Sequence, residues 1–131
     1  MRPQRPEPRR IKRVDQADKS DVWNGLEPEF VRDAAAERLK ALAHHDRLRI
    51  VEARAGTSRN VGEIAAAVRL PSSTISRHLR VLHDAEVVKC SRSGNNVRYV
   101  LADRDVLRLA LLAYRGAGGQ VRQRLRGRRV V

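Results

Sequence analysis

The sequence has a single cysteine, Cys90, and no long apolar run. One cysteine excludes an intrachain disulfide framework and agrees with a reducing compartment. No apolar run approaches the roughly 20 residues that a membrane-spanning helix needs. The first ten residues also lack the apolar segment of a secretory signal. We therefore expect a cytoplasmic protein with no membrane partner.

Acidic residues are scarce relative to basic ones. The chain has 28 Lys and Arg against 15 Asp and Glu, which gives a formal net charge of +13. This excess favours a polyanionic partner, either nucleic acid or an anionic membrane surface. Because the sequence offers no membrane segment, nucleic acid is the stronger interpretation.

The length of 131 residues is enough for one small domain with tails. Residues 1–19 are rich in Pro and Arg without periodicity, which predicts a disordered basic arm. Residues 20–116 are expected to form the domain. Residues 117–131, at the glycine cluster of Gly116, Gly118 and Gly119, are expected to form a second basic tail. Each tail either contacts phosphates or only aids solubility.

Residues 61–83 have the pattern of two short helices with a tight turn between them. The first helix ends at Leu70, because the residue before Pro71 is steered out of the helical region. In the second helix the apolar residues recur at i, i+4 and i+7, and either Ser72 or Ser73 is expected to cap it. Its apolar side consists of Ile75, Leu79 and Leu82, and its polar side of Thr74, Arg77, His78 and Arg80.

Two strand-like runs follow, residues 87–92 and 97–101. The residues between them tolerate a hairpin turn. This hairpin is basic, since it contains Lys89, Arg92 and Arg98. A helix-turn-helix followed at once by a basic hairpin predicts a winged helix. The expected fold is mainly α with a small β-hairpin wing, in the order ααααββα.

A further helix is expected on each side of this motif, at residues 28–43 and 103–114. The second is apolar nearly all round, and one small core cannot receive all of its apolar side chains. An apolar surface left over on a small domain usually marks an interface. We therefore expect a homodimer, while the alternative is that this helix wraps the core of its own chain.

Three segments resemble the ArsR/SmtB family of winged-helix bacterial repressors. They are residues 39–50, residues 73–79 and residues 86–89 leading into a glycine-containing wing. The resemblance implies a two-fold dimer formed by the first and last helices, on a pseudo-palindromic site with half-sites about one helical turn apart. The expected interface residues are Val31, Leu39, Val106, Leu109, Ala110, Leu112 and Ala113.

The second helix of the motif is then the recognition helix. Ser73, Thr74, Ser76 and Arg77 are expected to contact base edges or phosphates in the major groove. If one of Ser72 and Ser73 caps the helix, the other is free for DNA. His78 is expected either to pack between helices or to contact a phosphate, and it is not expected to bind a metal. Phosphate contacts are expected from Arg80, Lys89, Arg92 and Arg98, and a minor-groove contact from the wing tip at Asn95 and Asn96.

The ligand sets of the metal-sensing family members are missing here. Thiolate sensors have a Cys-x-Cys motif before the helix-turn-helix glutamate, and aligned on Glu63 its positions hold Asn60 and Gly62. Zinc-type sensors have four ligands on the last helix, where this chain has Asp103, Asp105, Gly116 and Gly119. No His or Cys follows Cys90, so we expect no metal at either usual site and no cofactor.

The signal is left open by the sequence. We expect either a non-metal inducer near the dimer interface or no inducer. His44 and His45 are interpreted as part of a solvated turn. Cys90, next to Lys89, is either a reactive thiolate or, as we expect, a buried inert thiol.

The predicted function is a sequence-specific DNA-binding transcriptional regulator, a homodimeric repressor. The main alternative is a nucleoid or RNA-binding winged-helix protein that ignores sequence and whose affinity collapses with salt. An enzyme is excluded by the lack of a converging set of nucleophile, base and orienting acid.

Overall fold

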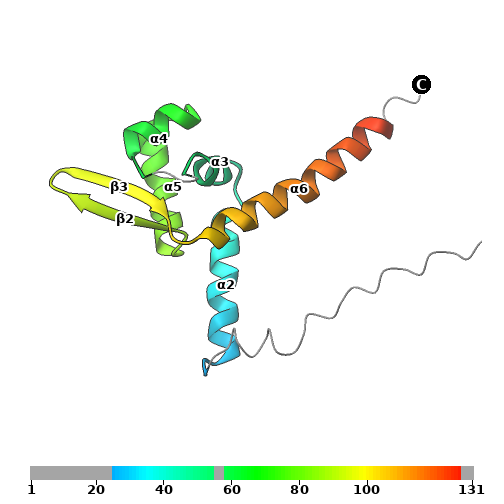
Figure 1. Cartoon of the computed structure of the whole chain (residues 1–131), viewed down its shortest axis with the longest axis horizontal. Helices are drawn as coiled ribbons and strands as arrows, with labels where there is room; N and C mark the ends of the chain where they lie inside the picture. Colours follow the sequence, from blue (N-terminus) through cyan, green and yellow to red (C-terminus); the bar gives the residue numbers. More distant parts are fainter. Residues whose placement is uncertain (1–24, 55–57, 128–131) are drawn as a thin grey trace, which may run out of the picture. The chain divides into compact units, whose positions relative to one another are not determined.

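The computed structural model describes residues 25–54 and 58–127, which form five helices and three strands (Figure 1). In chain order these elements are α2 (Pro28–Leu42), α3 (His45–Arg54), β1 (Arg59–Asn60), α4 (Val61–Val68), α5 (Ser72–Asp84), β2 (Val88–Ser93), β3 (Asn96–Leu101) and α6 (Arg104–Gly127). The expected basic arm at residues 1–19 lies outside the described residues, as do residues 128–131 of the expected tail. The expected fold class, helices followed by a β-hairpin wing and a last helix, is confirmed.

The chain divides into two compact units, residues 1–33 and 34–131. The described part of the first unit starts at Gly25, whose φ of +80° favours glycine, and continues into α2. Helix α2 begins at Pro28, which suits the first helical position because the backbone N–H that proline lacks would have no helical partner there. The second unit holds the rest of α2 and all the other elements.

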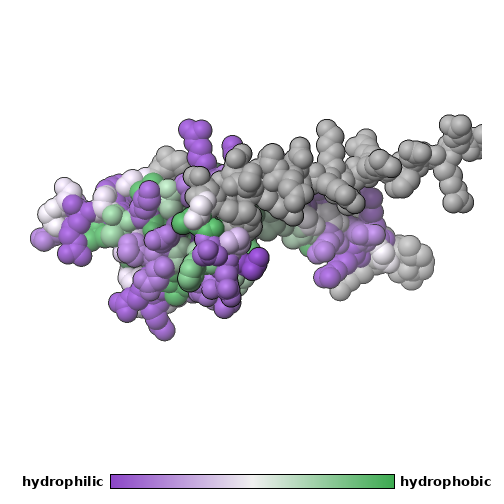
Figure 2. Space-filling view, turned by 90° about the horizontal axis from the view of Figure 1, so that it is seen from below, coloured by the Kyte–Doolittle hydropathy of each residue, from purple (hydrophilic) through white to green (hydrophobic). Residues whose placement is uncertain are grey.

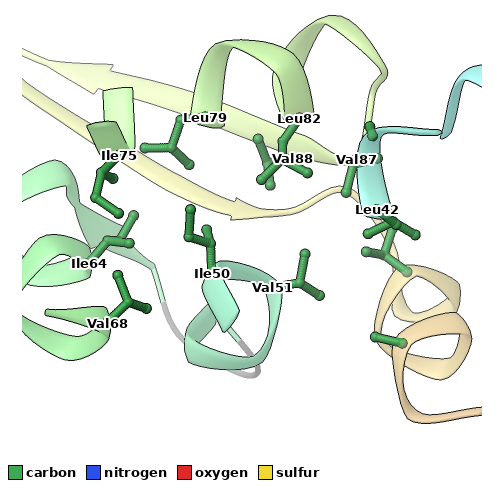
Figure 3. Packing of buried hydrophobic residues seen from close by; sticks show 13 residues of the cluster. Leu42, Ile50, Val51, Ile64, Val68, Ile75, Leu79, Leu82, Val87 and Val88 are labelled. Atoms are coloured by element: carbon green, nitrogen blue, oxygen red, sulfur yellow. The ribbon is translucent and has the colours of Figure 1, made fainter. Parts of the chain in front are cut away.

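The core of the second unit draws side chains from all its helices and from the start of the hairpin. Figure 3 shows Ile50 of α3, Ile64 of α4 and Ile75 of α5 converging on one interior. Burial of such side chains supplies about 1.5–3 kcal/mol each. The buried residues are Ala41, Leu42, Ile50, Val51, Ile64, Val68, Ile75, Leu79, Leu82, Val87, Val88, Val106 and Ala110.

The sheet has three antiparallel strands in the order β1-β3-β2. The hairpin pairs Val88 with Leu101 at its base and Ser93 with Asn96 at its tip. Gly94 in the turn has a φ of +59°, a value that favours glycine. Strand β1 is an addition to the expected two-stranded wing, and its Asn60 pairs with Arg98 of β3.

Helix α6 is longer than expected. It does not end near Tyr114 but continues through Gly116, Gly118 and Gly119 to Gly127. Glycine in a helix interior costs about 1 kcal/mol relative to alanine, but it ends a helix only where the chain turns into the left-handed region, and none of these three glycines has a positive φ. The expected tail at residues 117–131 is therefore helical up to Gly127. Among the described residues, no helix is both long and apolar enough to cross a membrane.

Candidate nucleic-acid interface

Helix α4 is fixed at both ends by local hydrogen bonds. At its start the Asn60 side chain accepts a bond from the Glu63 backbone N–H (2.8 Å), and the Glu63 carboxylate accepts one from the Asn60 N–H (3.2 Å). This reciprocal arrangement is a capping box. At its end Arg69 adopts φ +57°, a left-handed cap, and its N–H bonds to the Ala65 carbonyl. The chain then turns through Leu70 and Pro71 into α5.

Helix α5 begins without a side-chain cap. Pro71 occupies the capping position, and no side chain bonds to the first turn. The expectation that Ser72 or Ser73 caps the helix is therefore wrong, because both already lie in the first helical turn. Both side chains are exposed, so their hydroxyl groups point to the surface at the start of the helix.

The two sides of α5 differ sharply. Ile75, Leu79 and Leu82 are completely buried, as the i, i+4, i+7 spacing predicted. The opposite side is exposed, with Thr74 half-buried at its border. Its exposed residues are Ser72, Ser73, Ser76, Arg77 and Arg80. This helix therefore presents short hydroxyls and two arginines from a rigid, core-anchored support.

The hairpin extends beyond the core, and Figure 2 shows hydrophilic residues at its free end. Lys89 and Arg92 are both exposed on β2, but an odd spacing along a strand places them on opposite faces. Asn95 is exposed in the turn. Cys90 is exposed too, so the expected buried thiol is wrong. In the hairpin register Cys90 of β2 is paired with Tyr99 of β3.

Arg98 is held within the chain. Its Nε donates to the Ser58 hydroxyl (3.1 Å), and its terminal nitrogen donates to the Ser58 carbonyl (2.8 Å). The same nitrogen lies 3.5 Å from the Glu63 carboxylate. Arg98 thus connects β3 to the start of α4, whereas Lys89 and Arg92 are exposed on the wing.

His78 differs from its exposed neighbours on α5. Its side chain is only 14% exposed, and its Nε2 lies 4.0 Å from Asp46 Oδ2 at the start of α3. Its ring centre is 4.7 Å from that of His44. Burial lowers the pKa of His78, and the electrostatic effects of His44 and Arg47 lower it further. The packing role expected as one alternative for His78 agrees with this position.

The turn before α3 is organised by the same residues. His44 Nδ1 accepts a hydrogen bond from the Asp46 N–H (3.1 Å). His44 lies in the turn between α2 and α3, as expected, and it is not buried; the bond from Asp46 and the nearby His78 ring add contacts that the sequence did not predict. Asp46 in turn has a lowered pKa, chiefly because His45 bonds to its carboxylate.

At the positions where metal-sensing family members have their ligands, the side chains of this chain bond to other groups of the protein. The side chain of Asn60 caps α4. Asp103 accepts a bond from Arg38 (2.9 Å) and another from the Val106 N–H (3.0 Å), and the Arg38 bond is the main reason that the pKa of Asp103 is lowered. Asp105 lies 3.3 Å from Arg108. These groups serve helix ends and ion pairs.

The expected interface residues fall into two groups. Val106 and Ala110 were expected at the dimer interface, but they lie on the inner side of α6 and are buried in the core of their own chain. Leu39, Leu109 and Leu112 are 54%, 39% and 60% exposed. Ala113 is exposed as well, and Val31 lies in the α2 segment of the first unit.

Comparisons with known proteins agree with this geometry. The family described as "Bacterial regulatory protein, arsR family" matches residues 44–89. The HTH-type transcriptional repressor SmtB of Mycobacterium tuberculosis is 40% identical over 91 residues, which cover 70% of this chain and 67% of that protein. The chain belongs to the ArsR family. It is accordingly a DNA-binding transcriptional regulator of the winged helix-turn-helix type. The family consists of regulators rather than enzymes.

Solved structures of this ArsR-family fold are similar as well. The crystal structure of Rv0081 from Mycobacterium tuberculosis matches with a TM-score of 0.63 and 36% identity, covering 76% of this chain and 98% of that one. A solution structure of Mb0332 from Mycobacterium bovis, a homodimeric winged helix-turn-helix DNA-binding domain, matches with a TM-score of 0.65 and 32% identity. It covers 72% of this chain and 88% of that one.

Proposed function

We propose that this ArsR-family regulator is a homodimeric repressor that reads a pseudo-palindromic operator with the exposed side of α5. The observation that carries the proposal is the sharp division of α5. Its apolar side is completely buried, so the hydroxyls and arginines opposite are held rigidly at the surface. A helix of this kind fits the major groove.

Within α5 the residues near the amino terminus are assigned to the bases. Ser73, Ser76 and Arg77 are exposed there, and arginine pairs bidentately with guanine. Ser72 is exposed beside them. Thr74 is half-buried and is assigned a contact at the border of the groove. Sequence discrimination would then come mainly from Arg77.

Phosphate contacts are assigned to Arg80, Lys89 and Arg92, which are exposed on α5 and the wing. Such contacts position the protein and carry little sequence information. Asn95 at the wing tip is assigned to the minor groove. Arg98 is assigned the role of holding the wing, because Ser58 and Glu63 already bind its guanidinium.

The dimer is assigned to α2 and α6. Leu39, Leu109 and Leu112 expose apolar surface there, and Leu111 on α6 is 51% exposed. The Mb0332 domain, which has the same fold, is homodimeric. A two-fold dimer places two α5 helices on half-sites about one helical turn apart.

The two usual metal sites of the family are not expected to operate in this chain. Asn60 and Gly62 offer no thiolate, and the Asp103 carboxylate is bound by Arg38. Stoichiometric zinc, nickel or cadmium at those positions is therefore not the signal of this regulator.

The experiment is a binding titration by fluorescence anisotropy at about 0.15 M salt, where loose electrostatic binding is weakened. The duplex upstream of the protein's own gene is compared with a scrambled duplex. A preference of about 10³ or more supports the repressor.

The variants Arg77→Ala and Arg92→Ala separate the assigned roles. Arg77→Ala should cost about 1–3 kcal/mol on the preferred duplex only, and Arg92→Ala should weaken both duplexes alike. Equal binding of both duplexes, together with a uniform loss from Arg77→Ala, would instead favour a nucleoid or RNA-binding protein that ignores sequence.

A further inference from the structure

Three side chains with metal-ligating atoms lie together between the start of α3 and the recognition helix. They are His44, Asp46 and His78, and one ligand atom of each lies within 4.8 Å of the others. They belong to neither of the usual metal-ligand positions, which are near α4 and on α6. In the part of the chain that the structure describes, this is the group whose spacing suits a metal ion.

The spacing is slightly wider than a bound ion requires. Ligands about 2.0–2.1 Å from a tetrahedral zinc ion lie about 3.4 Å from one another. Asp46 Oδ2 and His78 Nε2 are 4.0 Å apart, so rotations of side chains that shorten these distances by about 1 Å would complete a site. His44 Nδ1 holds the Asp46 N–H, and an ion at this nitrogen has to compete with that bond.

Asp46 and His78 can each offer a ligand atom to a metal ion. Asp46 uses its Oδ1 atom toward His45 (3.3 Å) and Arg49 (3.5 Å), while its Oδ2 faces His78. The His78 side chain is only 14% exposed, so its Nε2 atom is held in a largely buried position opposite Asp46. Two imidazoles and one carboxylate suit zinc, nickel or cobalt rather than magnesium or calcium.

We propose that His44, Asp46 and His78 bind one divalent transition-metal ion per chain, with water filling the open coordination position. The ion would connect the turn before α3 to α5. Because His78 directly follows Arg77 in α5, occupancy of the site alters how the recognition helix is held. This consequence for DNA rests on the proposed function, whereas the metal site itself does not.

The test uses the untagged full-length protein, since a histidine tag would bind the same ions. Cobalt is titrated and followed by its visible absorption, and zinc is then added to displace it. We expect one equivalent per chain. His44→Gln, Asp46→Asn and His78→Gln should each weaken binding at least about tenfold.

His83→Gln is the matched control, because His83 is exposed on the same helix and lies outside the cluster. It should bind as the parent protein does, and circular dichroism checks that every variant is folded. The proposal is overturned if no saturable binding occurs below about 0.1 mM metal. It is also overturned if His83→Gln weakens binding while His78→Gln does not, because the ion would then bind at His83 and not at the cluster.

The DNA consequence is measured separately, with and without zinc, on the duplex preferred by the parent protein. His44→Gln is the informative variant, since His44 lies outside α5. Zinc should change the DNA affinity of the parent protein at least about threefold and leave that of His44→Gln unchanged. Equal effects on both proteins would refute the coupling. Metal binding needs no DNA, so its failure is distinguishable from a failure of the proposed function.

Discussion

Replacing Arg98 with alanine distinguishes a residue that holds the wing from one that contacts phosphate. The change removes two hydrogen bonds to Ser58 and an ion pair with Glu63. The Arg98 side chain is 41% exposed, so the hydrogen bonds are worth about 0.5–1 kcal/mol each and the ion pair about 0.2–1 kcal/mol. The free energy of unfolding should therefore fall by about 1–3 kcal/mol.

The assay is urea unfolding followed by circular dichroism, at one fixed protein concentration because a dimer's stability depends on it. Arg92→Ala is the matched control. Arg92 is exposed on the same hairpin, and its loss should change the unfolding free energy by less than about 0.5 kcal/mol. In DNA titrations Arg92→Ala should reduce the salt slope by about 1 per chain, whereas Arg98→Ala should leave the slope unchanged.

The reverse pattern would refute the assignment. If Arg98→Ala unfolds like the parent protein and loses one unit of salt slope, Arg98 contacts phosphate and its bonds to Ser58 have no energetic importance.

Three further predictions concern the core, the start of α5 and an ion pair. Leu79→Ala should lower the unfolding free energy by about 2–5 kcal/mol, measured by the same urea titration, because Leu79 is completely buried. Ser72→Ala and Ser73→Ala should leave it within about 0.5 kcal/mol, since neither serine caps α5; a loss near 1 kcal/mol would indicate a cap. The pKa of Asp103 is lowered in the folded protein by its bond to Arg38. This bond therefore adds to the free energy of unfolding above pH 3.8, and its contribution disappears as the pH falls through the lowered pKa. Asp103→Asn should thus flatten the acid limb of a pH titration of stability, and an unchanged limb would contradict this.

The sequence was sufficient for the features that follow from periodicity. The buried positions of Ile75, Leu79 and Leu82 follow from their spacing. Pro71 predicted a break between the two helices, but α4 ends two residues earlier than expected, at Val68, with Arg69 as its left-handed cap. The hairpin was predicted to within one residue at each strand end, because its apolar runs flank a glycine-containing turn. The polar side of α5 was visible for the same reason as its apolar side.

Other features depend on tertiary contacts that no local pattern contains. The short strand β1 forms only because β3 lies beside it, although the Asn60 and Glu63 pair is a capping signal that could have marked the start of α4. The grouping of His44, Asp46 and His78 depends on the approach of α3 to α5. The burial of Val106 and Ala110 depends on which side of an apolar helix faces the core.

The length of α6 was misjudged for an energetic reason. Three glycines predict a break in the helix, but their cost of about 1 kcal/mol each is spread over a 24-residue helix. The exposure of Cys90 was missed because alternation along a strand does not reveal which face of a projecting hairpin is covered.

In the proposed function, α5 reads a specific sequence as part of a two-fold dimer. The most direct test is selection of bound duplexes from a random pool at about 0.15 M salt, followed by sequencing. We expect enrichment of an inverted repeat with half-sites about one helical turn apart, and loss of preference at one base pair of each half-site with Arg77→Ala. A bound pool with no enriched motif would contradict sequence-specific reading by α5.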